Sequence, residues 1–249
     1  MKQFTFSFLM FLMISACQNE EGDKELKSYQ IQIQEPGKTP ELAPIGSFEQ
    51  SLVDQGLVDI QEVDPTIYVD LKYSTTDNFF GEDVYQELTR AYLPLDVAEE
   101  LKTANELLKF DYPDYRLLVF DAVRPHRIQT ILWEALDSIP PLNRKAFVAD
   151  PALGSLHNYG CAVDLSIYDV RADTLLDMGT KYDYFGHLAY PRKEEEMLLS
   201  GQLNEKQIAN RRILRKMMGK AGFTPINSEW WHFNTTSLAV AKEKYKLIE

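Results

Sequence analysis

The sequence is poor in cysteine, in basic residues and in histidine, and the first two shortages exclude classes of protein. Two cysteines, Cys17 and Cys161, are too few for a small domain held together by several disulfides. Lysine and arginine number 26 against 38 acidic residues, so the formal net charge is -12. This balance argues against nucleic acid as a partner and against a charge-driven contact with an anionic membrane. No internal repeat is evident.

Long hydrophobic runs are also lacking, apart from one at the N-terminus. Lys2 precedes an apolar stretch over residues 4–14, and the small pair Ser15-Ala16 stands before Cys17. This pattern indicates a secretory signal peptide, because a transmembrane helix needs about 20 apolar residues. The segment around Cys17 also resembles the bacterial lipobox, in which the cysteine is acylated.

The N-terminal pattern predicts where the protein resides. We expect residues 1–16 to be a lipoprotein signal peptide and Cys17 to be the lipidation site. The protein would then be a membrane-anchored lipoprotein of the bacterial cell envelope, bound to the membrane through lipid only. An ordinary signal peptide cut near Cys17, which leaves a soluble secreted protein, is the alternative.

Composition divides the remaining chain into a tether and one domain. Residues 17–45 are polar and acidic, contain several prolines and show no periodic apolar face, so they are predicted to form a flexible acidic tether. The length of the chain and its 45% hydrophobic content suit one substantial core. We therefore expect a single catalytic domain over residues 46–249.

The hydrophobic patterns of this domain mix helices and strands. Short apolar runs at residues 67–71 and 117–120 predict strands, and another is expected to start at Asp164. Apolar residues recur at helical spacing over residues 95–108, in a stretch opened by Pro125, and over residues 208–218. Because helices and strands do not alternate regularly, the predicted fold class is α+β.

Two short segments hold the parts of a zinc site. His157 and Asp164 stand in the first, Ser155–Asp164, and Glu229 and His232 in the second. Catalytic zinc takes three protein ligands, from imidazole and carboxylate, and leaves a position for water. His157, Asp164 and His232 would bind one Zn²⁺ per chain, and Glu229 would be the general base.

Each element alone has a structural interpretation. A single histidine is more often a hydrogen-bonded structural residue, and a Glu-x-x-His pair occurs by chance in many proteins. The combination is more specific, because the chain has only four histidines and two of them stand in these segments beside a carboxylate.

Both segments resemble the zinc D-alanyl-D-alanine dipeptidases, the vancomycin-resistance type of D,D-carboxypeptidase-like metallopeptidases. The likeness covers roughly residues 60–235 and includes four further segments, which are Leu71–Gly81, Asp121–Pro125, Met178–Asp183 and Asn210–Leu214. The resemblance implies a central antiparallel sheet flanked by helices and a small D,D-dipeptide substrate. Val123 departs from the family, which usually has an aromatic residue there.

The resemblance also implies roles for three more residues. Arg124 would stabilise the oxyanion of the transition state, Asp183 would hold the ammonium of the dipeptide, and Ser155 would make another substrate contact. From the sequence alone, Arg124 is better explained as a surface arginine in an ion pair, and Asp183 equally as a turn residue. Cys161 is expected to be a small buried packing residue, neither ligand nor nucleophile.

The predicted function is zinc-dependent hydrolysis of D-Ala-D-Ala in the cell envelope. One alternative is a D,D-carboxypeptidase or peptidoglycan endopeptidase that trims longer peptides. Another is a zinc-stabilised binding module without turnover, although a purely structural zinc has no need of Glu229 or Arg124. The sequence gives no oligomeric state.

Overall fold

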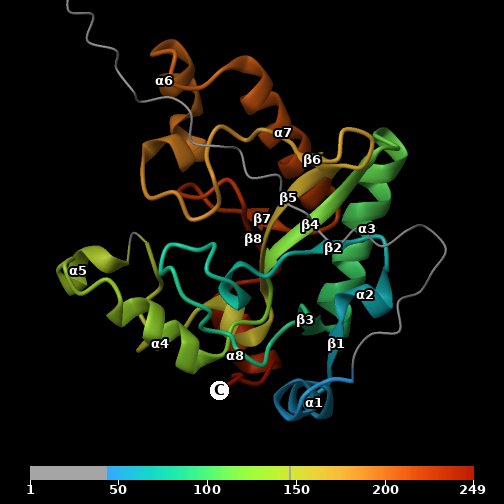
Figure 1. The fold of residues 1–249 in the computed structure, drawn as a ribbon, viewed down its shortest axis with the longest axis vertical. Coiled ribbons are helices and arrows are strands. Elements are labelled where there is room, and N and C mark those ends of the chain that lie inside the picture. Colours follow the sequence, from blue (N-terminus) through green and yellow to red (C-terminus); the bar gives the residue numbers. More distant parts are fainter. Residues whose placement is uncertain (1–43, 146) are drawn as a thin grey trace, which may run out of the picture. The chain divides into compact units, whose positions relative to one another are not determined.

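A mixed β-sheet forms the centre of the computed structural model, which describes residues 44–145 and 147–249 (Figure 1). Its strands follow the order β2 (Tyr68–Val69), β4 (Tyr115–Asp121), β5 (Ala162–Asp169), β8 (His232–Asn234) and β7 (Thr224–Pro225), and β6 (Thr174–Leu175) pairs with β5 beside this path. β2 runs parallel to β4, and the other pairs are antiparallel. The predicted α+β fold is confirmed, and the predicted antiparallel sheet departs only at β2. A separate antiparallel pair joins β1 (Leu57–Asp59) to β3 (Tyr92–Pro94).

In the part of the chain that the structure describes, helices surround the sheet, and four short 3-10 helices stand between them. The α-helices are α1 (Ser47–Asp54), α2 (Ile60–Val63), α3 (Leu95–Asp111), α4 (His126–Glu134), α5 (Pro141–Arg144), α6 (Glu194–Leu199), α7 (Glu205–Lys220) and α8 (Leu238–Lys244). The 3-10 helices are η1 (Lys72–Ser74), η2 (Leu156–Tyr159), η3 (His187–Ala189) and η4 (Pro191–Lys193).

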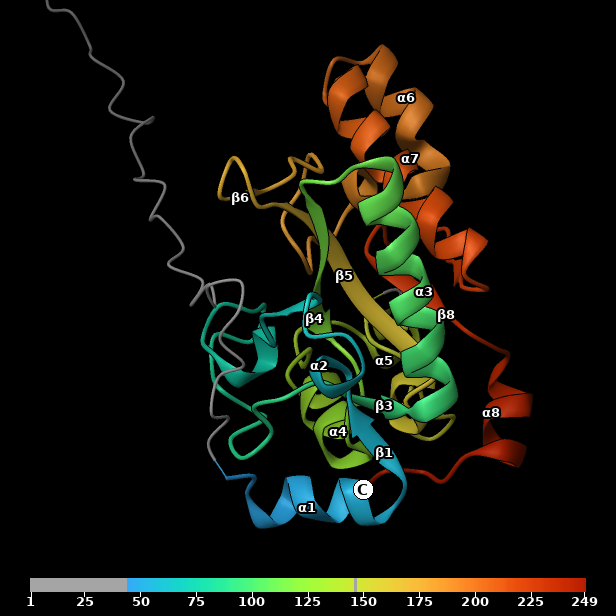
Figure 2. The ribbon, with the colours of Figure 1, turned by 90° about the vertical axis from the view of Figure 1, so that its right-hand side faces the viewer.

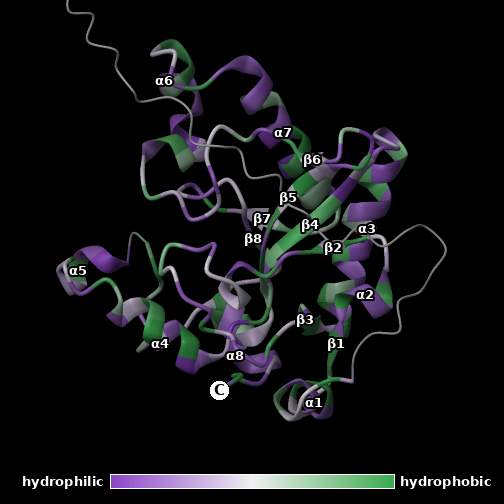
Figure 3. Ribbon diagram, viewed as in Figure 1, coloured by the Kyte–Doolittle hydropathy of each residue, from purple (hydrophilic) through white to green (hydrophobic). Residues whose placement is uncertain are grey.

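The core lies between β4, β5 and the two long helices. The residues of β4 from Leu117 onward and of β5 up to Tyr168 are buried, and both strands stand out as hydrophobic in Figure 3. A strand that is covered on both faces reads as a continuous apolar run, which explains the pattern at residues 117–120. Figure 2 shows α3 and α7 side by side along one face of these strands.

The sequence determines the limits of the two long helices. In α3, the buried residues Val97, Leu101, Ala104 and Leu108 recur every three or four positions and form its core face. At the start of α7, the side-chain oxygens of Asn204 and Gln207 each accept a hydrogen bond from the backbone N–H of the other residue, which makes a capping box. The helices predicted over residues 95–108 and 208–218 are therefore confirmed, with longer ends.

Other predicted elements are shorter or lie elsewhere. Of the strand predicted over residues 67–71, only β2 pairs in the sheet. The signal peptide, Cys17 and all but the last residues of the predicted tether lie outside the described residues. Within residues 44–145 and 147–249, no helix has both the length and the hydropathy that crossing a bilayer requires.

Candidate active site

Two paired strands and one short helix bring together the predicted metal ligands. Asp164 on β5 lies directly opposite His232 on β8 in the antiparallel register. His157 lies in η2, between the Ser155 cap and Gly160. Gly160 has φ +64, and a Cβ atom there would lie 2.6 Å from Pro94 Cδ, so no other residue fits without a shift. The Gly of the His-x-x-Gly segment is thus explained by the turn that leads from His157 into β5.

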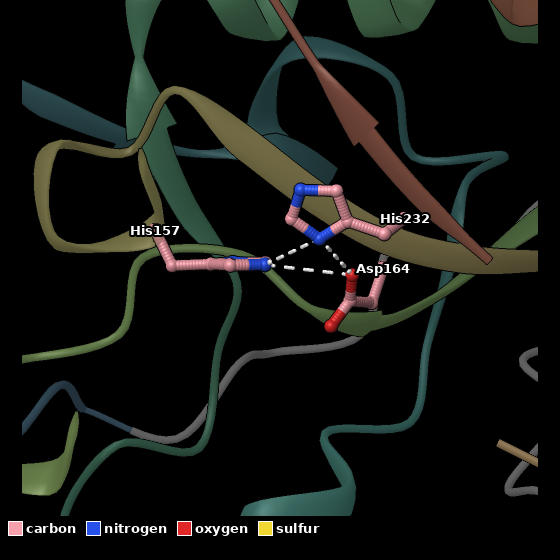
Figure 4. Close-up of side chains that lie close together, drawn as sticks. All are labelled: His157, Asp164 and His232. Carbon is pink, nitrogen blue, oxygen red and sulfur yellow. Dashed lines mark hydrogen bonds and ion pairs between the residues drawn. The ribbon is translucent and has the colours of Figure 1, made fainter. Parts of the chain in front are cut away.

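The three side chains point at one another (Figure 4). His157 Nε2 lies 3.2 Å from His232 Nδ1 and 3.4 Å from Asp164 Oδ1, and His232 Nδ1 lies 2.9 Å from the same oxygen. His157 and Asp164 are buried, and His232 is nearly so. Within the described residues, the group has the composition and spacing of a metal site.

The hydrogen bonds on the outer side of both imidazole rings determine which ring nitrogens carry the proton and which face the site without one. His157 Nδ1 lies 2.7 Å from the carbonyl oxygen of Ala122, which can only accept, so this nitrogen carries the proton. His232 Nε2 donates to Asn234 Oδ1 at 2.7 Å. Both inward nitrogens therefore face the Asp164 carboxylate with lone pairs, and positive charge between these three groups, from a metal ion or a proton, would stabilise the arrangement. Two imidazoles and one carboxylate are a donor set of catalytic zinc, so the residues fit this ion.

The charges within the site also favour the binding of a cation. Burial alone would raise the pKa of Asp164, but His157 and His232 hold it well below its usual range. Burial alone would lower the pKa of His157, but the negative charge of Asp164 raises it. An ionised carboxylate in a buried pocket that draws positive charge is suited to a metal ion.

Glu229 lies beside the metal ligands, on the segment before β8. Its Oε2 is 3.9 Å from His232 Nδ1, and its side chain is 23% exposed. Burial raises the pKa of the Glu229 carboxyl to about 7, against the opposing charge of His232. A carboxyl that titrates near neutral pH is suited to accept a proton and return it.

Arg124 is buried, so the surface interpretation of this residue is wrong. It follows β4 and Val123, and its Nε and NH2 groups donate to Asp121 Oδ2 at 2.9 and 2.6 Å. NH1 donates to Gln129 Oε1 at 3.1 Å, and NH2 lies 3.7 Å from Asp164 Oδ2. Each terminal nitrogen of the guanidinium keeps one further N–H group, and Arg124 lines the same cavity as the metal ligands.

Asp183 lies in a turn, as one of its two sequence interpretations has it, and its side chain also lines the cavity, where a contact with substrate remains a prediction. Its φ is +55, a left-handed conformation that is uncommon outside glycine and often occurs at functional sites. The Tyr73 hydroxyl donates to Asp183 Oδ2 at 2.9 Å. Burial, and next the charge of Asp164, raise the pKa of Asp183 to about 8.

Ser155 has a structural contact in addition to its place in the cavity. Its Oγ accepts a hydrogen bond from the backbone N–H of His157 at 3.3 Å and so caps η2. Ser155, Asp183, Arg124, Glu229 and the three metal ligands all line one cavity of about 320 Å³.

Three contacts around the ligands were not anticipated from the sequence. Asn234 holds the ring of His232, and the Tyr182 hydroxyl donates to Asp164 Oδ2 at 3.0 Å. Asp121, which orients Arg124, also accepts from the Tyr85 hydroxyl at 2.5 Å. Asn234 follows His232 by two positions in a strand, which places both on one face, so period-two spacing was an available signal. Cys161 is a buried free thiol that packs in a core cluster with Tyr159 and Ala241, so its predicted packing role is confirmed.

Comparison with known proteins gives one consistent result. A family model described as D-ala-D-ala dipeptidase matches residues 53–248. The D-alanyl-D-alanine dipeptidase of Escherichia coli (strain K12) is 30% identical over 186 residues, which cover 74% of this chain and 86% of the relative. The D-alanyl-D-alanine dipeptidase of Enterococcus faecium is 29% identical, with coverage of 72% and 90%.

A solved structure is also similar, at greater distance. The vancomycin resistance D,D-pentapeptidase VanY in complex with Zn(II) shares 14% identity with this chain at a TM-score of 0.37 and covers 63% of it and 79% of its own chain. The extent of the family match and the identity to the Escherichia coli relative decide the assignment. The chain is an enzyme of the D-Ala-D-Ala dipeptidase family, whose members are zinc metallopeptidases.

Proposed function

We propose that this enzyme hydrolyses free D-Ala-D-Ala with Glu229 as general base and Arg124 as the group that stabilises the oxyanion. The observation that carries the proposal is the convergence of a complete set of groups on one cavity. The zinc-type donors, Glu229, Arg124 and Asp183 all line it, although they come from four distant segments of the chain. The dipeptidase relatives support the choice of substrate.

His157, Asp164 and His232 would hold the metal. Zinc there would act as a Lewis acid, which polarises the peptide carbonyl and makes water more acidic. Glu229 Oε2 accepts a proton from the attacking water and then donates it to the nitrogen of the scissile amide. Water thus adds to the carbonyl carbon, the C–N bond breaks, and two D-alanine molecules leave.

Arg124 supplies positive charge where the carbonyl oxygen becomes negative. Its orientation is set before substrate arrives, because Asp121 and Gln129 hold the guanidinium from behind. A preorganised donor of this kind stabilises the transition state more than the ground state. The spare N–H groups of NH1 and NH2 are the donors available to the oxyanion.

Asp183 favours a dipeptide over a longer chain. Its carboxyl is costly to ionise because it is buried, which raises its pKa, and a cationic partner removes that cost. The free ammonium of a dipeptide is such a partner, whereas an acylated amide nitrogen in a longer peptide is not. The residue therefore supports a dipeptidase over a carboxypeptidase or endopeptidase.

The cellular setting is proposed from the sequence. Export by the predicted signal peptide and acylation of Cys17 would place the enzyme in the cell envelope. The precursor pool of D-Ala-D-Ala lies inside the cell, so an exported enzyme suits recovery or remodelling of wall fragments. Cys17→Ala should release the protein from the membrane fraction. Increased glycopeptide resistance on expression would contradict the recovery role.

The central experiment compares two substrates. Zinc-loaded enzyme is assayed on D-Ala-D-Ala and on N-acetyl-D-Ala-D-Ala, with Glu229→Gln as the variant. We expect cleavage of the free dipeptide only, and a loss of kcat of about 10²- to 10⁴-fold in Glu229→Gln at unchanged zinc content. Cleavage of the acetylated peptide would instead identify a D,D-carboxypeptidase. Absence of cleavage of both, with zinc bound, would favour the binding module.

A further inference from the structure

The proposed substrate is a zwitterion, and the groups described so far bind only one of its two charged ends. Asp183 is suited to the ammonium, and the metal ligands, Glu229 and Arg124 surround the reacting bond. The carboxylate at the other end needs positive charge or hydrogen-bond donors to compensate for the water that it loses. Two permanently cationic side chains line the cavity within the described residues, Arg124 and Lys145.

Arg124 is largely occupied by other contacts. Three of its five N–H groups point at Asp121 and Gln129, and NH2 also lies 3.7 Å from Asp164 Oδ2. The two that remain sit on different nitrogens, and the oxyanion requires them. A bidentate pair with the substrate carboxylate would need the same N–H groups.

The ammonium group of Lys145, in contrast, is available for a ligand. Its side chain is exposed at the cavity, and within the described part of the chain its ammonium makes no ion pair or hydrogen bond. An ammonium on a flexible stem at the edge of a cavity can reach a carboxylate without the desolvation that a buried cation would suffer.

Residues 147–149, which follow Lys145 closely in the chain, contact the surroundings of both Arg124 and Asp183. Gln129, which accepts from Arg124, also donates from Nε2 to the carbonyl oxygen of Ala149 at 2.7 Å. On the other side, the ring of Phe147 packs against Phe185, with 4.8 Å between centroids, and Phe185 belongs to the same loop as Asp183. Lys145 and Asp183 thus lie on two segments that meet at the cavity and carry opposite charges.

We propose that Lys145 binds the C-terminal carboxylate of the dipeptide, together with the Ser155 hydroxyl. Ser155 Oγ accepts from the His157 N–H, which leaves its own proton to donate. The two charged ends of the substrate then meet opposite charges on different walls, which orients the dipeptide in one direction. This inference rests on the proposed hydrolysis of D-Ala-D-Ala.

The test compares the dipeptide with its C-terminal amide, which lacks the negative charge that Lys145 is proposed to bind. kcat and KM are measured for D-Ala-D-Ala and for its C-terminal amide, with wild type, Lys145→Met, Lys145→Arg and Lys181→Met, all zinc-loaded full-length chains. Lys181 is the control, because it is exposed on the loop of Asp183 but does not line the cavity, and its loss changes the net charge equally.

We expect Lys145→Met to raise KM for the free acid about tenfold and to leave the amide unchanged. Lys145→Arg should keep most of the affinity, and Lys181→Met should match wild type. Equal effects of Lys145→Met on acid and amide, or no effect on either, would overturn the role of Lys145.

A binding measurement separates this inference from the proposed activity. Calorimetry with D-Ala-D-Ala and its amide on Glu229→Gln, alone and combined with Lys145→Met, does not depend on turnover. If the acid binds and Lys145→Met does not weaken it, the inference is wrong while the dipeptide site stands. If neither ligand binds to any variant, both the inference and the proposed substrate are wrong.

Discussion

The floor of the cavity and the wall that carries Asp183 are built in opposite ways. The floor consists of paired strands, in which Asp164 and His232 face each other across β5 and β8 and the Leu165 N–H donates to the Trp231 carbonyl at 3.1 Å. The wall is the loop over residues 176–190, which has no strand and begins its first helical turn only at His187.

Side chains of α7 hold this loop in place of a sheet. Arg211, which is fully buried, donates from Nε to the Met178 carbonyl at 2.6 Å and from NH2 to the Leu188 carbonyl at 2.8 Å. Asn210 donates to the Asp177 carbonyl at 2.8 Å. Both ends of the loop therefore depend on one helix. Under the proposed function, the chemistry would sit on rigid strands and substrate selection on a supported loop.

Removal of Arg211 should weaken the wall much more than the floor. Arg211→Met deletes both loop contacts and leaves Glu194 with one arginine fewer, because Arg211 NH1 lies 3.5 Å from Glu194 Oε1. We expect the free energy of unfolding, measured by urea denaturation, to fall by about 3–5 kcal/mol. We also expect KM for D-Ala-D-Ala to rise while zinc affinity stays unchanged, since the floor does not depend on α7.

Arg215→Met is the matched control for this prediction. Arg215 binds the same Glu194 at 2.8 and 2.7 Å but contacts neither end of the loop. Its loss should destabilise the protein less and leave KM at the wild-type value. A loss of zinc affinity in Arg211→Met equal to its effect on KM would show that floor and wall are one unit.

The sequence predicted the floor better than the wall, for a physical reason. His157, Asp164, Glu229 and His232 lie in two short segments whose residue types and spacing already suit zinc chemistry. The long helices were also predictable, since their apolar periodicity spans several turns and a capping box marks the start of α7. Each of these signals is local in the chain.

The features that escaped prediction depend on contacts between distant segments. The burial of Arg124 follows from how β4 packs, and its partner Gln129 lies on a helix whose position the sequence does not reveal. The parallel direction of β2 and the contact of Tyr182 with Asp164 likewise depend on long-range packing. Asp183 could be named as a turn residue, but only the position of its loop brings it to the cavity.

Zinc binding at the floor should depend on the hydrogen bonds that hold the outer sides of the imidazole rings. Asn234→Ala removes the acceptor that orients His232, so zinc affinity should fall about 10- to 100-fold. Asn234→Asp should raise zinc affinity, because a carboxylate makes the ring a more basic ligand. Competition with a chromophoric chelator measures both values.

Asn227→Ala serves as the control for Asn234. Asn227 is exposed in the segment before β8, and only its carbonyl oxygen is engaged, by Arg192 NH1 at 3.0 Å. The zinc affinity of Asn227→Ala should equal that of wild type. A weakened zinc affinity in Asn234→Asp would contradict the proposed orientation of His232.

The cost of keeping Asp183 in the wall should appear as a dependence of stability on pH. In the metal-free protein its pKa is raised to about 8 from an ordinary 3.8, so the folded state holds the proton more tightly than the unfolded chain. The free energy of unfolding should therefore fall as pH rises between these values, and Asp183→Asn removes this loss. We expect urea denaturation in chelator to show equal stability of both proteins near pH 4. Above pH 8, Asp183→Asn should be the more stable protein, although its KM for the dipeptide rises. A stability difference that does not change with pH would mean that the Asp183 carboxyl ionises in the folded protein as easily as in water.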